Sequence, residues 1–565
     1  MQMITDILNN LDSVLGSASW FAACLLGTGL YFTIALKLPQ FRLFGRGMSM
    51  LSKANRDKGE GDANTVGALS TALSGTIGTG NVGGVAFALF LGGPAALFWM
   101  WATAFLGMAS KMVEVTMVHK YRDQLADGTF AGGTMYVLSR RLGMPFLGGV
   151  FAVMTILTVI GSGGMIQMRT ISTSIEETFN IDVWVSSLAG VALLGVVIIG
   201  GVRRITQVAT YMVPSMAIFY IIGTSGIIIF NAENLPGAIA SIIGDVFTGT
   251  AVVGGFLGAG IAQAFQSGVA RGLFSNEAGQ GSAPMAHAMA RTEKSADEGV
   301  VALLEPMIDT LIICSLTGLA LLASGAWSQK HEVNFAPLET EYVQGEYRQD
   351  NPEHLEALSA WIAEDGGGVQ PASGRYAVVE GKLQLNEDGS APISILHSRS
   401  LAEDVVFLDA AGEPWSGELA LDDGRLSASG NAPSLRGRSL THSVPLTIRM
   451  FEQSYGSYGS LLVTLPLLLF AFSTLLTWQY YGDRSTRYLF KDNKLAARIW
   501  QLTFMGCCFV GGIADTKLVW TLSTVTQALM TLPNLFCMIM LRREIREDIE
   551  AYSSELRQAP PPAKK

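Results

Sequence analysis

The sequence predicts an all-α polytopic membrane protein, with two groups of five helices behind one leading helix and a small β-rich unit inserted outside the membrane. Three observations support this prediction. Hydrophobic residues make up 49% of the 565 residues and charged residues only 15%, against about 25% charge in soluble proteins. Eleven apolar runs reach the length of a membrane span. Two of these runs are interrupted by glycine and polar residues at corresponding places in the two groups.

Apolar runs of about 20 residues recur along almost the whole chain. We place them near residues 18–37, 67–90, 95–118, 146–174, 183–202, 208–230, 247–270, 299–326, 458–481, 495–514 and 517–541. The first run follows a polar, acidic start without the basic residues and cleavage pattern of a signal peptide, so we expect it to remain as a span. The membrane part therefore comprises residues 1–326 and 444–541.

Basic residues gather in every second connection between the runs. The first connection contains Lys37 and Lys58, and the fifth contains Arg203 and Arg204. The alternate connections are short or acidic. Because basic connections stay on the cytoplasmic side, we expect the N-terminus outside and the tail, residues 542–565, in the cytoplasm.

A polar block at residues 327–443 separates the eighth and ninth runs on the outer side of the membrane. Acidic residues outnumber basic ones in it, and the whole chain has a net charge of −9. Residues 354–363 predict a short helix, and later segments alternate apolar and polar residues around glycine turns, as hairpin strands do. We expect a small β-rich domain, which is either a hydrated surface or a device that concentrates cations.

Several chemical functions find no support in the sequence. The five cysteines lie in apolar runs, where they behave as small buried hydrophobes, and the six histidines are scattered. We therefore expect no disulfide and no zinc or iron cofactor. The sequence contains no nucleophile-base set, phosphate-binding loop or nucleic-acid patch, so we expect neither an enzyme nor a nucleic-acid partner.

The second run contains a glycine-rich interruption at residues 70–84, with the sequence STALSGTIGTGNVGG. Each glycine costs a helix about 1 kcal/mol, and hydrocarbon offers no partner to free backbone groups. A broken helix survives there when it is buried in protein or lines a cavity, as in many secondary transporters. A glycine-lined helix-packing face is the alternative.

The seventh run contains a second interruption, which begins with Gln266, Ser267 and Gly268 after Phe265. Runs two to six and seven to eleven form two groups of five, and the leading run of each group is interrupted. A unit with an odd number of spans that is repeated once has opposite orientations in the membrane, as in inverted-repeat transporters. The pair of interruptions therefore favours a binding site over a packing face.

Several motifs together resemble one family. The segments SGTIGTGNVGG, GGTMYVL, GVARGLFSNEAGQGSA, LLEPMIDTL and FAFSTLLTWQYYGD are similar to those of the alanine/glycine:cation symporter family, also called sodium:alanine symporters. The resemblance covers about 16–326 and 450–541 but not the insertion. It implies a LeuT-type fold that carries a small neutral amino acid, alanine or glycine, with Na⁺ across a bacterial cytoplasmic membrane. It implies no cofactor besides the coupling ion.

An amino-acid substrate needs donors for its carboxylate and acceptors for its ammonium group. The N–H groups at the start of a half-helix are such donors, and we assign this role to Thr79, Gly80 and Asn81. Helix capping is the alternative for Asn81. We expect carbonyl groups of the second interruption, placed at 266–275 and including Gly268, to accept from the ammonium group.

Gln167, Thr474 and Trp478 complete the expected substrate site. The resemblance implies that Gln167 contacts the substrate, and an interhelical hydrogen bond is the alternative. Thr474 and Trp478 are four residues apart and share one helix face. Trp478 resembles a wall or lid of the pocket, with ordinary packing as the alternative.

The resemblance also implies a sodium site. By analogy with LeuT-type transporters, the hydroxyl groups of Ser473 and Thr474 coordinate Na⁺ with backbone carbonyls near Ser74 and Ile77, because oxygen ligands suit a hard cation. The alternative is that both hydroxyls bond back to their own helix. Asp309 lies about 15 Å into the eighth run and is a candidate second cation contact or proton carrier.

The roles of the other charged residues in the apolar runs are less specific. Lys111 and Glu114 fit an i,i+3 pair close to the membrane interface. Arg271 and Glu277 flank the second interruption and form either a gate pair or backbone caps. Glu305 precedes Asp309 by one turn on the same face.

A sodium-coupled symporter is therefore the first hypothesis, and a proton-coupled symporter that uses Asp309 is the runner-up. A membrane sensor would need a cytoplasmic output domain, whereas residues 542–565 form only a short charged tail. A channel would need a continuous polar lining, whereas the polar residues cluster at one depth. The oligomeric state stays open.

Overall fold

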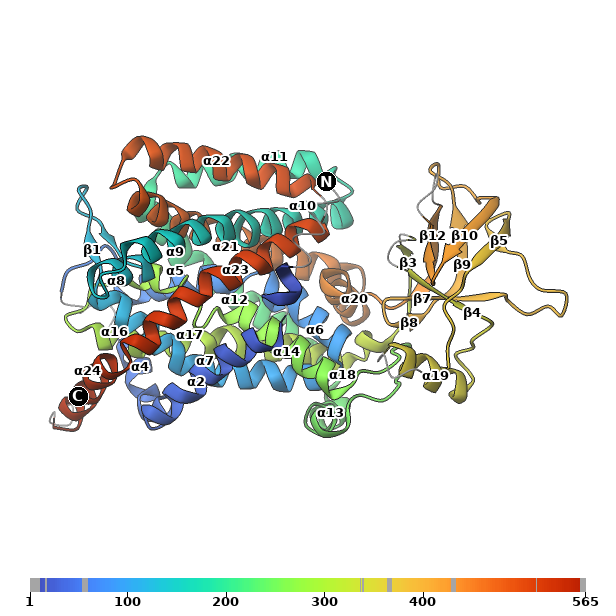
Figure 1. Ribbon diagram of the computed structural model, residues 1–565, viewed down its shortest axis with the longest axis horizontal. Coiled ribbons are helices and arrows are strands. Elements are labelled where there is room, and N and C mark those ends of the chain that lie inside the picture. Colours follow the sequence, from blue (N-terminus) through green and yellow to red (C-terminus); the bar gives the residue numbers. More distant parts are fainter. Residues whose placement is uncertain are drawn as a thin grey trace.

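A helical bundle and a strand-rich unit form the two parts of the molecule (Figure 1). The structure is a computed structural model that describes residues 11–15, 18–52, 59–335, 337, 340–362, 368–427, 433–514 and 516–558. The strand-rich unit projects beyond one end of the bundle, and the C-terminal helix α24 (Arg542–Gln558) lies at the opposite end (Figure 1). The block at 327–443 and the tail thus occupy opposite ends of the molecule.

The helices of the bundle vary widely in length, and several are interrupted by π-helical turns. In chain order, the first half contains α2 (Ser19–Ala35), α3 (Pro39–Arg42), α4 (Phe44–Leu51), α5 (Thr65–Thr76), η2 (Gly80–Gly84), α6 (Val85–Gly92), α7 (Ala95–Lys120), α8 (Thr134–Arg140), α9 (Pro145–Thr158), η3 (Val159–Met165), α10 (Ile166–Phe179), α11 (Val183–Ile198) and α12 (Gly201–Phe230). The second half contains η4 (Ala232–Asn234), α13 (Leu235–Thr248), α14 (Ile261–Asn276), α15 (Pro284–His287), α16 (Ser295–Ala302), α17 (Leu304–Pro306), η5 (Met307–Cys314), α18 (Ser315–Ser324), η6 (Ala326–Ser328), α20 (Ser443–Tyr455), η8 (Gly456–Tyr458), α21 (Gly459–Leu489), α22 (Lys494–Ile513) and α23 (Thr516–Met540).

The bundle is that of a polytopic membrane protein. Among the described residues, seven helical segments are long and apolar enough to cross a membrane, or eight when one bent pair of helices counts as a span. The predicted runs near 18–37 and 183–202 form shorter apolar helices, Trp20–Ala35 and Val183–Ile198.

The seventh run departs from its predicted bounds. The sequence predicts a span near 247–270, but α14 begins only at Ile261. Gly249 ends α13 with φ 74°, and Gly258 has φ 92°, a left-handed conformation that glycine adopts at little cost. These glycines turn the chain outside a helix, so the first part of the predicted run is a loop.

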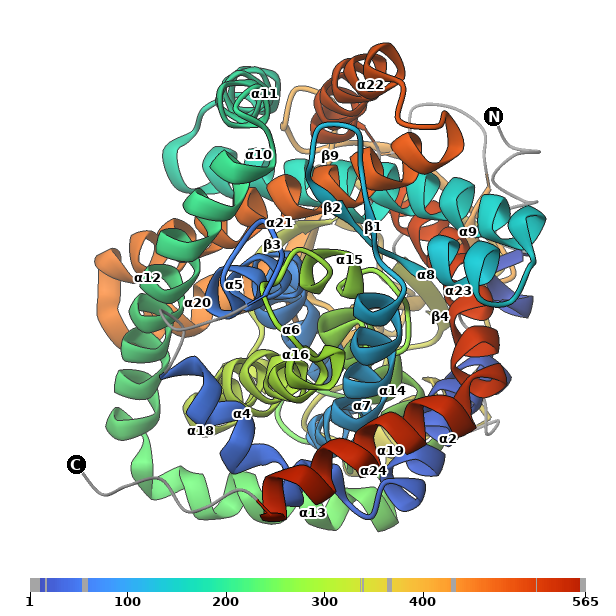
Figure 2. The same cartoon turned by 90° about the vertical axis from the view of Figure 1, so that its left-hand side faces the viewer.

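The two interrupted helices lie at the centre of the bundle. In Figure 2, α5, α6 and α15 are surrounded by α7, α9, α10, α12 and α23. Every residue of α5 except Val66 is buried. This placement satisfies the requirement that irregular backbone at membrane depth be covered by protein.

Three small antiparallel sheets form the strand-rich unit, with strand orders β3-β12-β9, β4-β7-β8 and β11-β10-β5-β6. The strands are β3 (His331–Phe335), β4 (Thr340–Gln344), β5 (Gly374–Val379), β6 (Lys382–Leu383), β7 (Ile393–His397), β8 (Ser400–Leu401), β9 (Glu403–Leu408), β10 (Gly417–Asp422), β11 (Arg425–Leu426) and β12 (Ser434–Ser439). A short hairpin of β1 (Asp123–Gln124) and β2 (Phe130–Ala131) belongs to the bundle instead. Helix α19 (Pro352–Ile362) occupies nearly the segment predicted to be helical. Phe407, Leu419 and Val378 belong to the apolar core of the unit.

The strand-rich unit contacts the loop that precedes α14. The Leu257 N–H donates to the Arg399 carbonyl oxygen at 3.1 Å, and Arg399 Nη2 donates to the Gly258 carbonyl oxygen at 2.7 Å. The unit is therefore fastened to the loop that leads into α14.

Candidate functional site

The first interruption separates α5 from the π-helical turn η2. Asn64 caps the start of α5, where its side chain accepts from the Gly67 N–H at 2.7 Å. The helix ends at Thr76, and Ile77 leaves it with φ −75° and ψ 98°. The two halves of the broken helix are bent by 53°. The predicted interruption of the second run is thus confirmed, with its unwound part at 77–78.

Asn81 supports this break in two ways. Its Oδ1 accepts from the Gly78 N–H at 2.8 Å, so it satisfies a backbone donor that the break leaves free, as a cap does. Its Nδ2 donates to Asp309 Oδ1 at 2.7 Å and to the Asp309 carbonyl oxygen at 3.0 Å. The side chain therefore acts as a backbone cap and also joins the first break to the eighth run.

The second interruption lies further along the chain than the sequence predicts. We placed it at 266–275, but α14 is continuous up to Asn276. The unwound stretch runs from Glu277, with φ 52°, to α15, and it includes Gly279 and Gly281, each with φ 84°. Glutamine and serine do not break a helix that packs well, whereas left-handed positions do, and those are best filled by glycine.

Gly268 is consequently a packing residue and does not line the break. It lies inside α14, and a Cβ added to it would stand 2.3 Å from the Ala96 carbonyl oxygen of α7. Only a residue without a side chain permits this close approach of two helices. The structure therefore does not place Gly268 at the unwound backbone, where the sequence analysis expected it.

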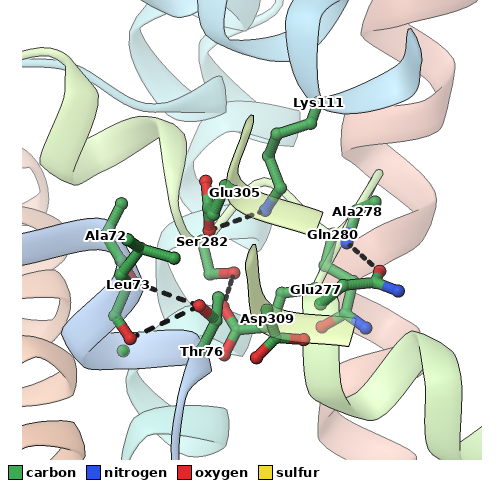
Figure 3. A network of polar contacts seen from close by, with 12 residues as sticks. Ala72, Leu73, Thr76, Lys111, Glu277, Ala278, Gln280, Ser282, Glu305 and Asp309 are labelled. Atoms are coloured by element: carbon green, nitrogen blue, oxygen red, sulfur yellow. Dashed lines mark hydrogen bonds and ion pairs between the residues drawn. The ribbon is translucent and has the colours of Figure 1, made fainter. Parts of the chain in front are cut away.

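The end of α14 and the first break lie side by side. A Cβ added to Gly80 would be 3.3 Å from the Phe274 ring and 3.7 Å from Ser275 Cα. The Ser275 hydroxyl donates to Asp309 Oδ2 at 2.8 Å. Figure 3 shows Thr76 at the end of α5 gathered with Asp309 and with Glu277 and Ser282 of the second break. The two interrupted helices thus meet around Asp309, which η5 contributes.

The hydroxyl pair of α21 faces the last turn of α5. Ser473 Oγ lies 3.4 Å from the Ser74 carbonyl oxygen, and Thr474 Oγ1 lies 3.5 Å from the Ile77 carbonyl oxygen. Both hydroxyls also donate to the Phe470 carbonyl oxygen, at 2.9 and 3.0 Å. The structure therefore brings the four oxygen-bearing residues of the expected cation site together, while their hydroxyls bond back to α21.

Trp478 and Gln167 border the first break from two sides. Trp478 Nε1 donates to the Gly75 carbonyl oxygen at 3.2 Å, and the indole is only 2% exposed. A Cβ on Gly78 would be 2.8 Å from Thr474 Oγ1 and 3.6 Å from Gln167 Oε1. Gln167, Thr474 and the backbone of Gly78 thus share one small space.

Two polar atoms at this place lack a partner. The hydroxyl of Thr79 and the Oε1 of Gln167 are buried and have no hydrogen-bond partner among the described residues. Buried polar atoms are nearly always hydrogen-bonded. Their unused capacity is what a site for a small polar ligand requires.

Arg271 and Glu277 do not form the gate pair considered from the sequence. The Arg271 guanidinium lies over the Phe87 ring, 4.6 Å from its centre. Glu277 accepts from the Ser282 hydroxyl at 2.5 Å within the second break. The alternative role, bracing the backbone of the break, fits Glu277.

Lys111 and Glu114 lie deeper in the protein than the sequence predicts. Both side chains are fully buried, with Nζ 3.6 Å from Glu114 Oε1 and 3.3 Å from Glu305 Oε1. Glu305 therefore pairs with Lys111, whereas Asp309 one turn later faces the first break. Segments that follow α14 cover the pair: Glu305 contacts Lys111, and the Gly281 N–H donates to Glu114.

Several residues of this region escaped the sequence analysis. They are Ser282, His287, Glu298, Thr310 and Asn534. Ser275 was included in the second interruption, but without its contact to Asp309. Polar residues beside each interruption were a usable signal for Ser275, Ser282 and Thr310. Glu298 and His287 lie in a connection that composition alone marks as cytoplasmic, so their burial depends on the tertiary fold.

Known proteins resemble this chain over nearly its whole length. The profile of the sodium:alanine symporter family matches residues 1–346 and 429–565. The chain belongs to the sodium:alanine symporter family.

Three relatives illustrate the range of this family. An uncharacterized transporter of Haemophilus influenzae is 32% identical over 98% of this chain and 97% of its own length. The sodium/alanine symporter AgcS of Methanococcus maripaludis is 29% identical over 97% of each chain. The probable sodium/glutamine symporter GlnT of Bacillus subtilis is 26% identical over 98% of this chain and 92% of its own. Membership of the family makes this sodium:alanine symporter homologue a membrane transporter of the amino-acid:cation symport class.

Proposed function

We propose that the protein is a secondary active symporter that couples Na⁺ influx to uptake of a small neutral amino acid, alanine or glycine, by alternating access. The observation that carries the proposal is the pair of unsatisfied atoms, Thr79 Oγ1 and Gln167 Oε1, beside an unwound helix. They supply a donor and an acceptor next to the unwound backbone of the first break. Thr79, Gly80, Asn81, Gln167, Thr474 and Trp478 would form the substrate site.

The chemistry of a zwitterion suits this arrangement. Its carboxylate would accept from N–H groups at the start of η2, where the helix dipole favours negative charge. Its ammonium group would donate to carbonyl oxygens at the first break and at the end of α14. Asp309 lies between these elements and accepts hydrogen bonds from Asn81 and from Ser275.

Na⁺ would bind between α5 and α21. The carbonyl oxygens of Ser74 and Ile77 and the hydroxyls of Ser473 and Thr474 offer oxygen ligands from two helices, as hard cations prefer. When Na⁺ binds, the hydroxyl protons must turn away from the carbonyl oxygens, so that oxygen lone pairs face the ion. Binding would therefore fasten α21 to the broken helix.

The energy source follows from the charge of the ion. Na⁺ that moves into a cell with an interior of about −100 mV releases about 2.3 kcal/mol per charge. The concentration gradient of Na⁺ adds to this value. One ion per substrate thus supports tens-fold accumulation of the amino acid.

The proposed architecture is a LeuT-type inverted repeat with one leading helix and eleven spans, the N-terminus outside and the tail in the cytoplasm. The broken helices α5–α6 and α14–α15 would lead the two repeats. The strand-rich unit would then lie outside the cell, next to the start of α14.

We infer that the site takes a small substrate. Gly80 faces Phe274 closely, and Trp478 closes the space on another side. The name of the relative GlnT associates one family member with a larger substrate. The residues that line the substrate site of each member would therefore determine its selectivity.

Uptake of labelled alanine into liposomes that contain the purified full chain tests the proposal. With an inward Na⁺ gradient we expect accumulation that collapses when K⁺ replaces Na⁺, and competition by glycine. Equal uptake in Na⁺ and K⁺ contradicts sodium coupling.

The fully buried carboxyl group of Asp309 favours proton coupling as the second candidate. In that case a proton gradient without Na⁺ drives uptake, and Asp309→Asn abolishes its dependence on external pH. The same liposomes distinguish the two couplings.

A further inference from the structure

A cluster of buried ionisable side chains lies outside the proposed substrate and sodium sites. Lys111 of α7 faces Glu114 and Glu305, at 3.6 and 3.3 Å. His287 of α15 lies between Glu298 and Glu305, with Nδ1 2.6 Å from one carboxylate and Nε2 3.2 Å from the other. All five side chains have no solvent exposure.

The cluster holds one more acid than base. Carboxylates only accept hydrogen bonds, so the ring of His287 between two of them donates from both nitrogens and is positively charged. Lys111 and His287 then provide two positive charges against the three carboxylates of Glu114, Glu298 and Glu305. A buried charge without a partner costs several kcal/mol, so a net charge of −1 favours uptake of one proton.

Glu114 is the least compensated of the three acids. Glu298 has His287 at 2.6 Å, and Glu305 has both His287 and Lys111. For Glu114, the nearest positive charge is Lys111 at 3.6 Å, and Lys111 also faces Glu305. Its Oε1 and the Lys111 Nζ have no hydrogen-bond partner within the described part of the chain.

Glu114 is also tied directly to the second break. Its Oε2 accepts from the Gly281 N–H at 3.2 Å and from Asn534 Nδ2 at 2.9 Å. Asn534 itself donates to the Gly279 carbonyl oxygen at 2.8 Å and accepts from the Thr134 hydroxyl at 2.6 Å. A change of charge at Glu114 therefore acts on both left-handed glycines of the break.

Charged and titratable groups reach this region from every neighbouring element. They are Lys111 on α7, Glu277 after α14, His287 on α15, Glu298 on α16, Glu305 on α17, Asp309 on η5, Tyr481 on α21 and Arg122 beyond α7. Two neighbouring elements contribute uncharged side chains: Asn534 of α23 contacts Glu114, and Thr134 of α8 contacts Asn534. Glu277 and Asp309 are two further buried acids in this region.

We propose that Glu114 is a proton-binding site that neutralises the buried cluster and controls the fastening of the second break. The proton comes from water and returns to it. The consequence for transport rests on the proposed function, but proton binding itself does not.

Infrared titration of the purified full chain, without Na⁺ or amino acid, tests the site. The wild type is expected to show the carbonyl stretch of a protonated carboxylic acid that disappears as the pH rises. Glu114→Gln keeps the acceptor oxygen for Gly281 and Asn534 and is expected to lose this band. Glu114→Asp is expected to keep a band that titrates at a shifted pH.

Glu277→Gln is the matched control, because Glu277 is a buried acid of the same break. Its spectrum should retain the titrating band. A wild type without the band, a band that survives Glu114→Gln, or loss of the band in Glu277→Gln would each overturn the inference. If the band behaves as expected while alanine uptake proves independent of Na⁺, only the proposed function fails.

Discussion

The Asn81 amide nitrogen lies 2.7 Å from Asp309 Oδ1, across more than two hundred residues of sequence. Asp309 Oδ2 accepts from Ser275 at 2.8 Å and from Thr310 at 2.7 Å. One carboxylate therefore joins the first interrupted helix, the end of α14 and η5. Alternating access, as proposed, would move these elements relative to one another, so we expect this carboxylate to influence transport.

Asp309→Asn should impair transport more than it impairs folding. The amide offers one acceptor oxygen to three donors, and a buried donor left without a partner costs about 1–3 kcal/mol. We expect uptake to fall by about tenfold or more, since 1.4 kcal/mol corresponds to a factor of ten. Initial uptake rates per amount of monodisperse protein measure the effect.

Thr310→Val is the control for Asp309. It removes one donor to the carboxylate and leaves the contacts with Asn81 and Ser275 in place. We expect a loss smaller than that of Asp309→Asn. Near-normal uptake by Asp309→Asn would show that the carboxylate is only structural.

Thr474→Val should weaken activation by Na⁺. The substitution removes the hydroxyl that lies 3.5 Å from the Ile77 carbonyl oxygen, while its shape is kept. A hydrogen bond or ligand oxygen to a charged group is worth about 1.5–3 kcal/mol, so the Na⁺ concentration for half-maximal uptake should rise by about tenfold or more. Uptake measured against Na⁺ concentration gives this value.

Thr477→Val provides a matched control on the same helix. Its hydroxyl donates to the Thr71 carbonyl oxygen at 3.1 Å, one turn away from the expected ion. We expect its Na⁺ dependence to stay near that of the wild type. An equal shift in both variants would place the effect in the packing of α21 against α5.

Much of this site could be predicted from the sequence because its signals are local. A run of glycines in an apolar segment, such as residues 70–84, indicates a helix break whatever the tertiary fold around it. Adjacent hydroxyls at Ser473 and Thr474 on an apolar helix stand out in the same way. The identity of the opposing carbonyls came from the family resemblance rather than from composition.

The errors arose where tertiary contacts decide. Gln266, Ser267 and Gly268 look like a break, but the close approach of α7 makes the glycine a packing residue. The actual break depends on left-handed backbone at Glu277, Gly279 and Gly281, which polarity does not reveal. The burial of Lys111 and Glu298 likewise depends on segments distant in the sequence.

Gly268→Ala tests the corrected role of that residue. A Cβ placed 2.3 Å from the Ala96 carbonyl oxygen must push α14 and α7 apart, and overpacking of this kind costs about 1–3 kcal/mol. We expect a lower melting temperature in detergent and an unchanged preference between alanine and glycine. Gly244→Ala, where a Cβ meets nothing within 4 Å, should melt like the wild type. A selective loss of one substrate would return Gly268 to the binding site.

The docking of the C-terminal helix should depend on acid pH. Burial opposes the ionisation of Glu544, but hydrogen bonds from Tyr121, Lys120 and Arg141 outweigh it and lower its pKa from 4.5 to about 2. A depressed pKa means that the stabilisation is complete above the ordinary value and is lost as the pH falls toward the folded value. We therefore expect the protection of the α24 amides, corrected for the intrinsic exchange rate at each pH, to fall as the pH falls from 4.5 toward about 2.

Glu544→Gln should release α24 already at neutral pH. The control is Glu550→Gln, which breaks only a 3.0 Å pair with Arg546 inside the same helix. Hydrogen exchange that is equally slow in Glu544→Gln and the wild type would mean that apolar contacts alone hold the tail.

The contact between Gly80 and Phe274 should set the upper size of the substrate. A methyl group at residue 80 would stand 3.3 Å from the Phe274 ring, which pushes the ring into the space next to the first break. Gly80→Ala is therefore expected to lower uptake of alanine more than that of glycine, because one methylene group in a tight pocket is worth about 1–3 kcal/mol. Gly84→Ala lies in the same helical turn, and its Cβ would meet nothing within 4 Å, so its ratio of alanine to glycine uptake should equal that of the wild type. Competition between the two labelled amino acids measures this ratio directly. An unchanged ratio in Gly80→Ala would mean that the substrate binds away from the meeting point of η2 and α14.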